Sequence, residues 1–373
     1  MKILVSGAGV AGLACARELG TRGHDITVVE HAPRLRVTGT PIDIRGDAIE
    51  AVERMGLLAE VRRHRVRMSE SVRFVDADGT PVARIPMSEV SDSDDDIELL
   101  RGDLVRVLAD ALPAGVTLRF DDAVRSLGNV EGERGVDVLL ASGHTGRYDL
   151  VIGADGQHSV VRDLLFGPEE KHLRHLGVYL ALAALPDEPR TGGANLIHNV
   201  PGRMAGVFHY GGGAVAVFQF RSERPDLDRH DPEGQKRALR EAFEGHRSWR
   251  IPELLAAAHA DPDFFLTPAG QIHLPTWHLG RAALVGDAGY CAAYLSGRGT
   301  SLALTGARFL AEELERAGGD HALAFARYET RQRPYVDFAQ DSVHGGRDRI
   351  VPATWEDIAA RDEALRAAGA GEP

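Results

Sequence analysis

Apolar runs and amphipathic stretches alternate along the first part of the chain. Short apolar runs cover 2–6 and 26–30, and between them residues 10–21 place apolar side chains at helical spacing. Residues 46–63 repeat the helical pattern, with apolar residues on one face. The order strand, turn, helix, strand predicts the first unit of an α/β sheet.

Short alternating segments dominate the middle of the chain. Asp78-Gly79 lies between the alternating runs 72–74 and 82–85 and predicts a hairpin, while residues 91–96 are typical of an acidic loop. Strands are predicted over 116–120, 136–140, 149–153 and 281–285, and an antiparallel sheet over 178–185, 194–199, 203–210 and 215–220. Helices are predicted over 101–112, 232–245, 252–259, 299–316, 321–340 and 355–368.

Composition narrows the class of protein. A chain of 373 residues suits two closely packed domains, and its net charge of -12 argues against nucleic acid or an anionic membrane surface as partners. No apolar run approaches the ~20 residues of a membrane span, and Met1 leads directly into a strand, which leaves no room for a signal peptide. We therefore expect a cytoplasmic monomer or homodimer that binds neither nucleic acid nor membrane.

The two cysteines, Cys15 and Cys291, are isolated, and no Cys/His cluster has metal-ligand spacing, so we predict no metal site. Cys15 falls on the inner face of the first predicted helix, where a small core residue is expected. Cys291 closely follows a Gly-Asp turn, so a packed thiol and a reactive thiol both stay open. The scarcity of cysteine fits a reducing compartment.

A glycine turn, Gly7, Gly9 and Gly12 at GxGxxG spacing, follows the first strand. Such a turn lets the backbone approach a pyrophosphate, and the helix that begins near Val10 points its free N–H groups at that anion. Glu30 ends the second strand, where an acid holds ribose hydroxyls and disfavours a 2′-phosphate. The pattern predicts an ADP-containing cofactor, FAD or NAD, with a chance glycine turn as the alternative.

Two further Gly/Asp turns follow apolar runs. Gly153-Ala154-Asp155-Gly156 precedes Ser159, and this stretch could be only a tight strand-to-helix connection capped by that serine. Gly286-Asp287 precedes a helix start at Gly299-Thr300-Ser301. An aspartate at a strand end suits a polyol, and a glycine-rich helix N-terminus suits an anion such as the N1/O2 edge of a reduced flavin. A dehydrogenase needs only the first turn, whereas an extended FAD would use all three.

With these three motifs in this order, the chain resembles the class A flavoprotein aromatic hydroxylases, the family of p-hydroxybenzoate hydroxylase, and above all its compact members that act on polyketides and tetracyclines. The resemblance extends from Lys2 to near Tyr335. It implies an α/β fold in which a Rossmann-like FAD-binding domain carries an inserted, mostly antiparallel β-sheet substrate domain and C-terminal helices. We expect the FAD-binding domain over 1–70, 98–172 and 278–340, the substrate domain over 71–97 and 173–277, and a C-terminal helical segment over 341–373.

The resemblance also implies a set of cofactor contacts along the chain. In chain order they are Gly7, Gly9, Val10, Ala11 and Gly12 for the pyrophosphate, Glu30 and His31 for the adenosine ribose, Arg45 near the flavin or NADPH, Arg101 for the phosphate and ribityl region, Val124 beside the adenine, Asp155 for the motif linked to FAD and NADPH, Asp287 for the ribityl chain, and Gly299, Thr300 and Ser301 for the pyrimidine edge of the flavin. Arg45 could instead be a salt-bridged surface residue, and Arg101 a surface residue at a helix start.

The activity that the resemblance implies is hydroxylation of a phenolic or polycyclic aromatic, polyketide-like small molecule. NADPH or NADH would reduce the flavin, O2 would then give a flavin C4a-hydroperoxide, and that species would transfer OH to the substrate, so the flavin carries the chemistry. No catalytic side chain is assigned. His198, His209, Phe218 and Tyr294 are candidate substrate contacts, with a packed residue as the alternative for each.

The chain departs from the family pattern after Gly286-Asp287. Tyr290 replaces a common histidine, Tyr294 stands near the usual proline, and Ser301 replaces a frequent asparagine. Contacts to FAD in this stretch are mainly backbone, so we expect binding to be kept and the tuning of the flavin to differ. Three other functions stay open: a same-fold flavoprotein that does not hydroxylate (a reductase or an FAD-scaffolded cyclase), an NAD-dependent dehydrogenase, and a binding protein that has lost FAD.

Overall fold

The computed structural model describes residues 1–37, 41–66, 72–85, 92–132, 135–188, 195–210, 213–223, 227–228 and 231–369. The chain divides into two compact units: unit 1 comprises Met1–Arg65, Asp95–Arg174 and Gly270–Ser342, and unit 2 comprises Val66–Asp94, His175–Ala269 and Val343–Pro373. The expected C-terminal segment, 341–373, is divided here: residues up to Ser342 belong to unit 1, and those from Val343 belong to unit 2. Residue 91 of the expected acidic loop and residue 194 of an expected strand lie outside the described residues.

Unit 1 is built on a six-stranded sheet in the order β17-β18-β11-β1-β2-β7. Its strands are β1 (Lys2–Ser6), β2 (Asp25–Val29), β7 (Val116–Arg119), β11 (Leu150–Gly153), β17 (His278–Leu279) and β18 (Ala282–Leu284). All neighbouring strands run parallel except β17, which is antiparallel to β18. Because the carboxyl ends of parallel strands share one edge, the turns that follow β1, β11 and β18 are neighbours.

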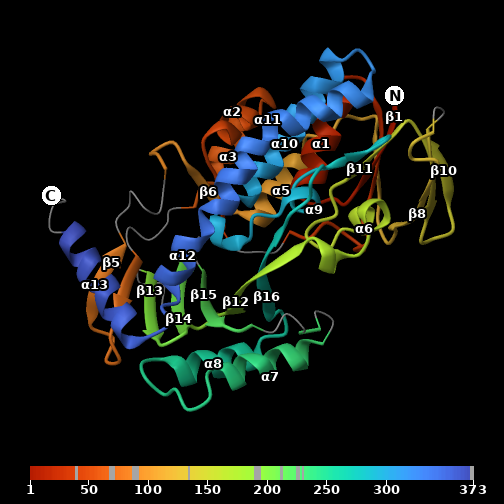
Figure 1. Cartoon of the computed structure of the whole chain (residues 1–373). Helices are drawn as coiled ribbons and strands as arrows, with labels where there is room; N and C mark the ends of the chain where they lie inside the picture. Colours follow the sequence, from red (N-terminus) through yellow and green to blue (C-terminus); the bar gives the residue numbers. More distant parts are fainter. Residues whose placement is uncertain are drawn as a thin grey trace. The chain divides into compact units, whose positions relative to one another are not determined.

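Two small sheets and a set of helices complete unit 1. The sheets are β8 (Val124–Gly128) with β9 (Val136–Leu140) and β10 (Thr145–Tyr148), and β3 (Pro41–Ile44) with β6 (Ile97–Leu100). The helices are α1 (Val10–Thr21), α2 (Asp47–Arg54), α3 (Leu58–Arg63), α5 (Arg101–Asp110), α6 (Val160–Phe166), α9 (Asp287–Tyr290), α10 (Gly299–Arg316) and α11 (His321–Asp341), with short 3-10 turns at Glu169–Lys171 and Tyr294–Ser296. α1 packs beside α10, and α10 lies along α11 (Figure 1).

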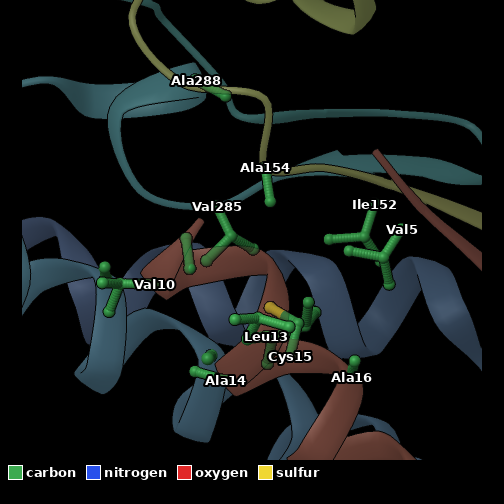
Figure 2. Packing of buried hydrophobic residues seen from close by; sticks show 14 of the residues in the cluster. Val5, Val10, Leu13, Ala14, Cys15, Ala16, Ile152, Ala154, Val285 and Ala288 are labelled. Atoms are coloured by element: carbon green, nitrogen blue, oxygen red, sulfur yellow. The ribbon is translucent and has the colours of Figure 1, made fainter. Parts of the chain in front are cut away.

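The core of unit 1 forms where α1 meets the six-stranded sheet. Leu13 and Cys15 of α1 are fully buried, as are Val5 of β1 and Ile152 of β11. Figure 2 shows these side chains packed together with Val285, the residue that follows β18. Burial of one leucine side chain contributes about 2 kcal/mol, so this cluster holds α1 firmly against the strands. The inward position predicted for Cys15 is confirmed.

The single helix predicted over 46–63 is wrong, because the structure has two helices, α2 and α3, in this stretch. Gly56 between them has a φ of +70°, and its N–H donates to the carbonyl oxygen of Glu53 at 2.7 Å, which closes the end of α2. Val52 and Val61, one in each helix, are both buried. The apolar face therefore continues through the break and hides it in the sequence pattern.

Unit 2 is built on a seven-stranded sheet in the order β16-β12-β15-β14-β13-β4-β5. Its strands are β4 (Val72–Val75), β5 (Pro81–Ile85), β12 (Leu173–Ala184), β13 (Asn195–Val200), β14 (Arg203–Tyr210), β15 (Gly213–Arg221) and β16 (Phe265–Ile272), and its helices are α7 (Pro232–Ala242), α8 (Ile251–Ala260), α12 (Val343–Ile350) and α13 (Trp355–Gly369). From β12 to β13 the described pairs are antiparallel, while β4 runs parallel to β13 and forms the predicted hairpin with β5.

One face of this sheet is covered by α7 and α8 (Figure 1). Cross-strand partners share a face, and His198, Ala205 and Phe218 stand in register across β13, β14 and β15. The Phe218 ring packs edge-on against that of Phe243 at the end of α7, with ring centroids 5.4 Å apart, so this row faces the helices. The predicted α/β class is confirmed, and within the described ranges no helix is long and apolar enough to cross a bilayer.

Candidate cofactor site

The three Gly/Asp turns of unit 1 touch one another. A Cβ atom on Gly7 would stand 2.5 Å from the carbonyl oxygen of Ala154, and one on Gly286 would stand 2.9 Å from Cβ of Ala11. The turn after β1 therefore contacts the turns after β11 and β18, as the order of the strands requires. Motifs that lie far apart in the sequence thus form one continuous region of backbone.

The glycine turn after β1 leaves a helix N-terminus open. A Cβ on Gly12 would stand 1.9 Å from the carbonyl oxygen of Gly7, so glycine is required for the turn itself. Gly9 is different, because the nearest atom to its Cβ position is Nη2 of Arg101 at 3.9 Å. α1 has neither a side-chain cap nor an acidic residue in its first turn. Its first N–H groups are therefore available to an anion.

Arg101, at the start of α5, brings a positive charge to this turn. Among the described residues its guanidinium forms no hydrogen bond and no salt bridge. Burial lowers the pKa of Arg101, and the Asp287 and Glu30 carboxylates oppose that shift, so both acids lie within electrostatic reach. The side chain keeps an exposed surface although protein atoms crowd around it. An unpaired guanidinium beside an open helix N-terminus suits a pyrophosphate.

Glu30 links the second strand to the glycine turn. Its Oε2 accepts the Ala8 N–H at 2.8 Å, and its Oε1 accepts the Ala32 N–H at 3.0 Å and lies 2.9 Å from His31 Nδ1. Oε2, with one partner among these, keeps acceptor capacity for a ribose hydroxyl. The Asp122 N–H donates to the Glu30 carbonyl oxygen at 3.1 Å, so the chain that leads into Val124 lies beside Glu30, at the expected adenine end.

Asp287 is the first residue of α9. Its carboxyl group is surrounded by protein atoms, yet part of its side chain is exposed. Protein atoms around its carboxyl raise its pKa, and the Arg101 guanidinium opposes this effect. The side chain nevertheless keeps an exposed surface, as a group that contacts a cofactor must. A Cβ on Gly299 would lie 3.8 Å from Asp287 Oδ1, and α10 has neither a side-chain cap nor an acidic residue in its first turn. The N–H groups of Gly299, Thr300 and Ser301 therefore start a second open helix N-terminus beside this acid.

Asp155 uses both carboxylate oxygens within the protein. One accepts the Ser159 hydroxyl, and the other accepts the Ser6 hydroxyl at 3.3 Å and the Val161 N–H at 3.2 Å. Ser159 in turn caps α6, because its oxygen accepts the Arg162 N–H at 3.0 Å. These contacts tie β1 to α6, so Asp155 positions the turn, and a direct contact with FAD stays a prediction.

Arg162 joins the second and third turns and received no role from the sequence patterns. Its side chain is fully buried and donates to the carbonyl oxygens of Gln157 at 2.6 Å and Ala288 at 3.3 Å, and to Glu169 at 2.8 Å. Its place three residues after Ser159, in the first turn of α6, is the signal that could have found it.

Replacing Arg162 with alanine is expected to lower the free energy of unfolding by about 3 kcal/mol, because two carbonyl groups and Glu169 lose their donor. Denaturant unfolding followed by circular dichroism measures this loss. Arg125→Ala, an exposed position on β8, serves as the control and should stay within about 0.5 kcal/mol of the unchanged protein. Equal stability of Arg162→Ala and the unchanged protein would contradict the role assigned here.

Arg45 is ion-paired, as one of the two alternatives expected, while a contact with flavin or NADPH stays a prediction. Its guanidinium forms a salt bridge with Asp43 at 2.9 Å, and its backbone N–H donates to the Ser301 hydroxyl oxygen at 2.9 Å. Nη2 of Arg45 lies 3.7 Å from the Cβ position of Gly297. Arg45 is therefore both ion-paired and close to the turn that leads into α10.

The tyrosine that replaces the family's histidine belongs to the core. The ring centroid of Tyr290 lies 4.4 Å from that of Trp277, and its hydroxyl oxygen lies 2.9 Å from that of Tyr328. Tyr290 thus packs in the core next to the Gly286-Asp287 turn. Cys291 is also buried, and its thiol donates to the Gly270 carbonyl oxygen at 3.3 Å, while burial raises its pKa well above the usual value. The packed alternative therefore fits this cysteine.

Two of the candidate substrate contacts pack inside unit 2. Both ring nitrogens of His198 are engaged, since Nδ1 lies 3.0 Å from the Val75 carbonyl oxygen and Nε2 lies 2.8 Å from the Ser248 hydroxyl oxygen. Phe218 is fully buried beneath α7. The geometry gives both residues the packing role that the sequence left open.

The other two candidates differ from these. His209 shares the helix-covered face, because it stands in register with Ala214, and its ring nitrogens are buried with no hydrogen-bond partner in the part of the chain that the structure describes. Tyr294 lies in unit 1, half-buried, with its pKa raised by burial. Phe208 and its partner Val215 occupy the opposite face of the sheet and are half-buried. Alternating side chains along β14 and β15 point to opposite faces of the sheet, and the positions of α7 and α8 decide which of the two faces is covered.

Comparison with known proteins agrees with this geometry. The FAD binding domain family matches residues 1–337 of the chain. An uncharacterized protein of Mycobacterium tuberculosis (strain ATCC 25618 / H37Rv) is 40% identical over 353 residues, which cover 92% of this chain and 94% of that protein. A flavin-dependent monooxygenase of Legionella longbeachae serogroup 1 (strain NSW150) is 35% identical over 343 residues, which cover 91% of this chain and 87% of that protein.

Solved structures extend the similarity to the fold. The crystal structure of tetracycline destructase Tet(55) matches with a TM-score of 0.84 at 34% identity and covers 98% of this chain and 95% of that chain. The matched residues include all three turns and both helix N-termini described above. The chain therefore belongs to the FAD binding domain family and, within it, to the class A flavin-dependent monooxygenases, which are oxidoreductases.

Proposed function

We propose that this monooxygenase hydroxylates a phenolic or polycyclic aromatic small molecule of the polyketide kind, with NADPH or NADH as the reductant and O2 as the oxygen source. Its similarity to a tetracycline destructase supports a polycyclic substrate. The observation that carries the proposal is Arg101, whose unpaired charge lies beside the glycine turn and within reach of Glu30 and Asp287.

The residues of unit 1 fit an extended FAD. The N-terminus of α1 and Arg101 would hold the pyrophosphate, Glu30 the adenosine ribose, and Asp287 the ribityl chain. The N-terminus of α10 would place N–H groups and a positive dipole end at the pyrimidine edge, where negative charge develops on reduction. Bound FAD would supply the redox chemistry and the reaction with oxygen, while the protein supplies binding, orientation and electrostatics.

The substrate would contact the face of the unit 2 sheet that α7 and α8 leave uncovered. Phe208 and Val215 are cross-strand partners on that face, and Val217 and Leu182 form the next such pair. Phe208, Val215 and Leu182 are half-buried and Val217 is buried, and such an apolar set would suit a planar aromatic molecule. The assignment moves the predicted substrate contact from Phe218 to Phe208.

Two phenylalanine variants test this assignment. Phe208→Ala is expected to raise the KM for the aromatic substrate several-fold and to cost about 1 kcal/mol of stability or less, because the ring is only half-buried. Phe218→Ala is expected to lower the free energy of unfolding by about 3–5 kcal/mol, because it leaves a cavity beneath α7. Steady-state kinetics and denaturant unfolding measure the two effects. The reverse pattern, with Phe218 controlling KM and Phe208 controlling stability, would contradict the assignment.

A panel of phenolic polyketides that includes tetracyclines tests the function itself. The expected result is substrate-stimulated NADPH oxidation that yields a product heavier by one oxygen atom. NADPH oxidation without oxygen in the product would favour a flavoprotein that does not hydroxylate, the alternative suggested by Tyr290 and Tyr294 in place of the family's histidine and proline. The absence of bound FAD would contradict both functions.

A further inference from the structure

One face of the small sheet formed by β3 and β6 carries a pair of acidic side chains, with Pro41 and Leu100 as the other cross-strand pair on that face. Asp43 on β3 stands directly opposite Glu98 on β6, so their side chains share a face. Arg45 and Asp96 come next on the same side, with Nε of Arg45 4.0 Å from Oδ2 of Asp96. The other face of this sheet is apolar and contributes to the core of unit 1. The carboxyl groups of Asp43, Glu98 and Asp96 and the guanidinium of Arg45 thus lie on one side of this sheet.

Glu98 faces the Asp43 carboxyl group across this sheet and lies within electrostatic reach of two guanidinium groups. Arg45 pairs with Asp43 at 2.9 Å, and Arg65, which follows α3, is the other cation that acts on Glu98. Oε2 of Glu98 is buried and has no hydrogen-bond partner among the described residues. Burial, followed by the Asp43 carboxylate, raises the pKa of Glu98 to about 8, and Arg45 and Arg65 oppose that shift. Folding therefore favours the protonated form of Glu98.

This charged face touches the turn that leads into α10. Nη2 of Arg45 and Oδ2 of Asp43 each lie 3.7 Å from the Cβ position of Gly297. The Arg45 backbone N–H donates to the Ser301 hydroxyl oxygen at 2.9 Å. A change of charge on Glu98 therefore acts, through Asp43 and Arg45, where the pyrimidine edge of the flavin is expected.

We propose that Glu98 is a positioning residue that tunes the flavin: by holding or releasing one proton it sets how much of the positive charge of Arg45 is available at the start of α10. This inference rests on the proposed function, because it requires FAD at that helix end. Reduced flavin carries negative charge on its pyrimidine edge, so an ionised Glu98 disfavours the reduced form. The reduction potential of bound FAD should therefore fall more steeply with pH once Glu98 ionises.

Stability should follow the same proton. Because the pKa of Glu98 is raised from 4.5 to about 8 by folding, the folded protein binds more protons than the unfolded chain between these values. This contribution to stability is complete below the unfolded value and is lost as the pH rises through the folded value. Glu98→Gln removes the ionisation, so it should gain stability relative to the unchanged protein as the pH rises over this range.

The deciding experiment measures the reduction potential of bound FAD against redox dyes from about pH 6 to about pH 10. The unchanged protein and the control Glu53→Gln, an exposed position on α2, should show a steeper fall near the pKa of Glu98. Glu98→Gln should lack this steeper segment while it keeps FAD. Asp43→Asn removes the facing negative charge and should move the segment to lower pH. A segment that persists in Glu98→Gln, or that does not move in Asp43→Asn, would overturn the proposal.

Different results would contradict the role of Glu98 and the proposed function. A protein that binds no FAD contradicts both. A protein that binds FAD and hydroxylates an aromatic substrate, but whose potential shows no steeper segment, contradicts only the role of Glu98. The pH dependence of unfolding gives a second readout, and parallel stability curves for Glu98→Gln and the unchanged protein would also count against it.

Discussion

Gly9→Val is expected to abolish FAD binding and to leave the chain folded. The nearest atom to the Gly9 Cβ position is the flexible end of Arg101, at 3.9 Å, so a Cβ added there meets no backbone of another segment. It would instead occupy the space in which a pyrophosphate approaches the N-terminus of α1. We expect the affinity for FAD to fall by at least ~100-fold, or about 2.8 kcal/mol. Isothermal titration of FAD into the apoprotein measures this loss.

Gly115→Val is the matched control for this variant, because its Cβ position has open space around it in the same unit. It should bind FAD as the unchanged protein does. Gly12→Val should behave differently again, since its Cβ would strike the Gly7 carbonyl oxygen at 1.9 Å and the fold itself should suffer. If Gly9→Val binds FAD with unaltered affinity, the assignment of the pyrophosphate to this turn is wrong.

Arg101→Ala should weaken FAD binding by about 1.5–3 kcal/mol, which is roughly 10- to 150-fold, because a charge-assisted hydrogen bond to phosphate is lost. The guanidinium forms no hydrogen bond or salt bridge with the rest of the described chain, so its removal should cost little stability. Fluorescence titration of FAD and thermal unfolding separate the two quantities. A large loss of stability with unchanged affinity would make Arg101 a structural residue.

Arg106→Ala provides the control on the same helix. Arg106 is exposed and pairs with Asp103 at 2.6 Å, so its removal takes one surface charge from α5 without touching the glycine turn. Its FAD affinity should stay within a factor of about two, since exposed ion pairs contribute little. An equal loss of FAD affinity in both variants would mean that Arg101 acts through the overall charge of α5 and not through a specific contact with FAD.

Local patterns in the sequence were sufficient for the cofactor part of the structure. The glycine turn and the Gly286-Asp287 turn each follow a predicted strand, Glu30 ends another, and parallel strands bring such residues to one edge. Their meeting at the carboxyl edge is therefore a consequence of strand order. The expected contacts with FAD there are mainly backbone, so we expect binding to be kept although Tyr290 and Tyr294 depart from the family pattern.

Features that depend on contacts across the fold could not be predicted. Alternation in β14 and β15 separates Phe208 from His209, but the covered face depends on where α7 and α8 pack. Glu98 follows an acidic loop in the sequence and gives no sign that Asp43 will stand opposite it. The break at Gly56 was hidden because apolar residues on both sides keep one helical phase. Each of these is set by register or packing between distant segments rather than by local propensity.

A crystal structure of the protein grown with FAD tests most directly whether one extended molecule connects the glycine turn with Asp287. We predict that the pyrophosphate lies at the N-terminus of α1 within hydrogen-bonding distance of the Arg101 guanidinium, that the ribityl hydroxyls bond to Asp287, and that the pyrimidine edge meets the first N–H groups of α10. Electron density for FAD that ends short of Asp287, or that lies away from Gly9 and Arg101, would contradict the account.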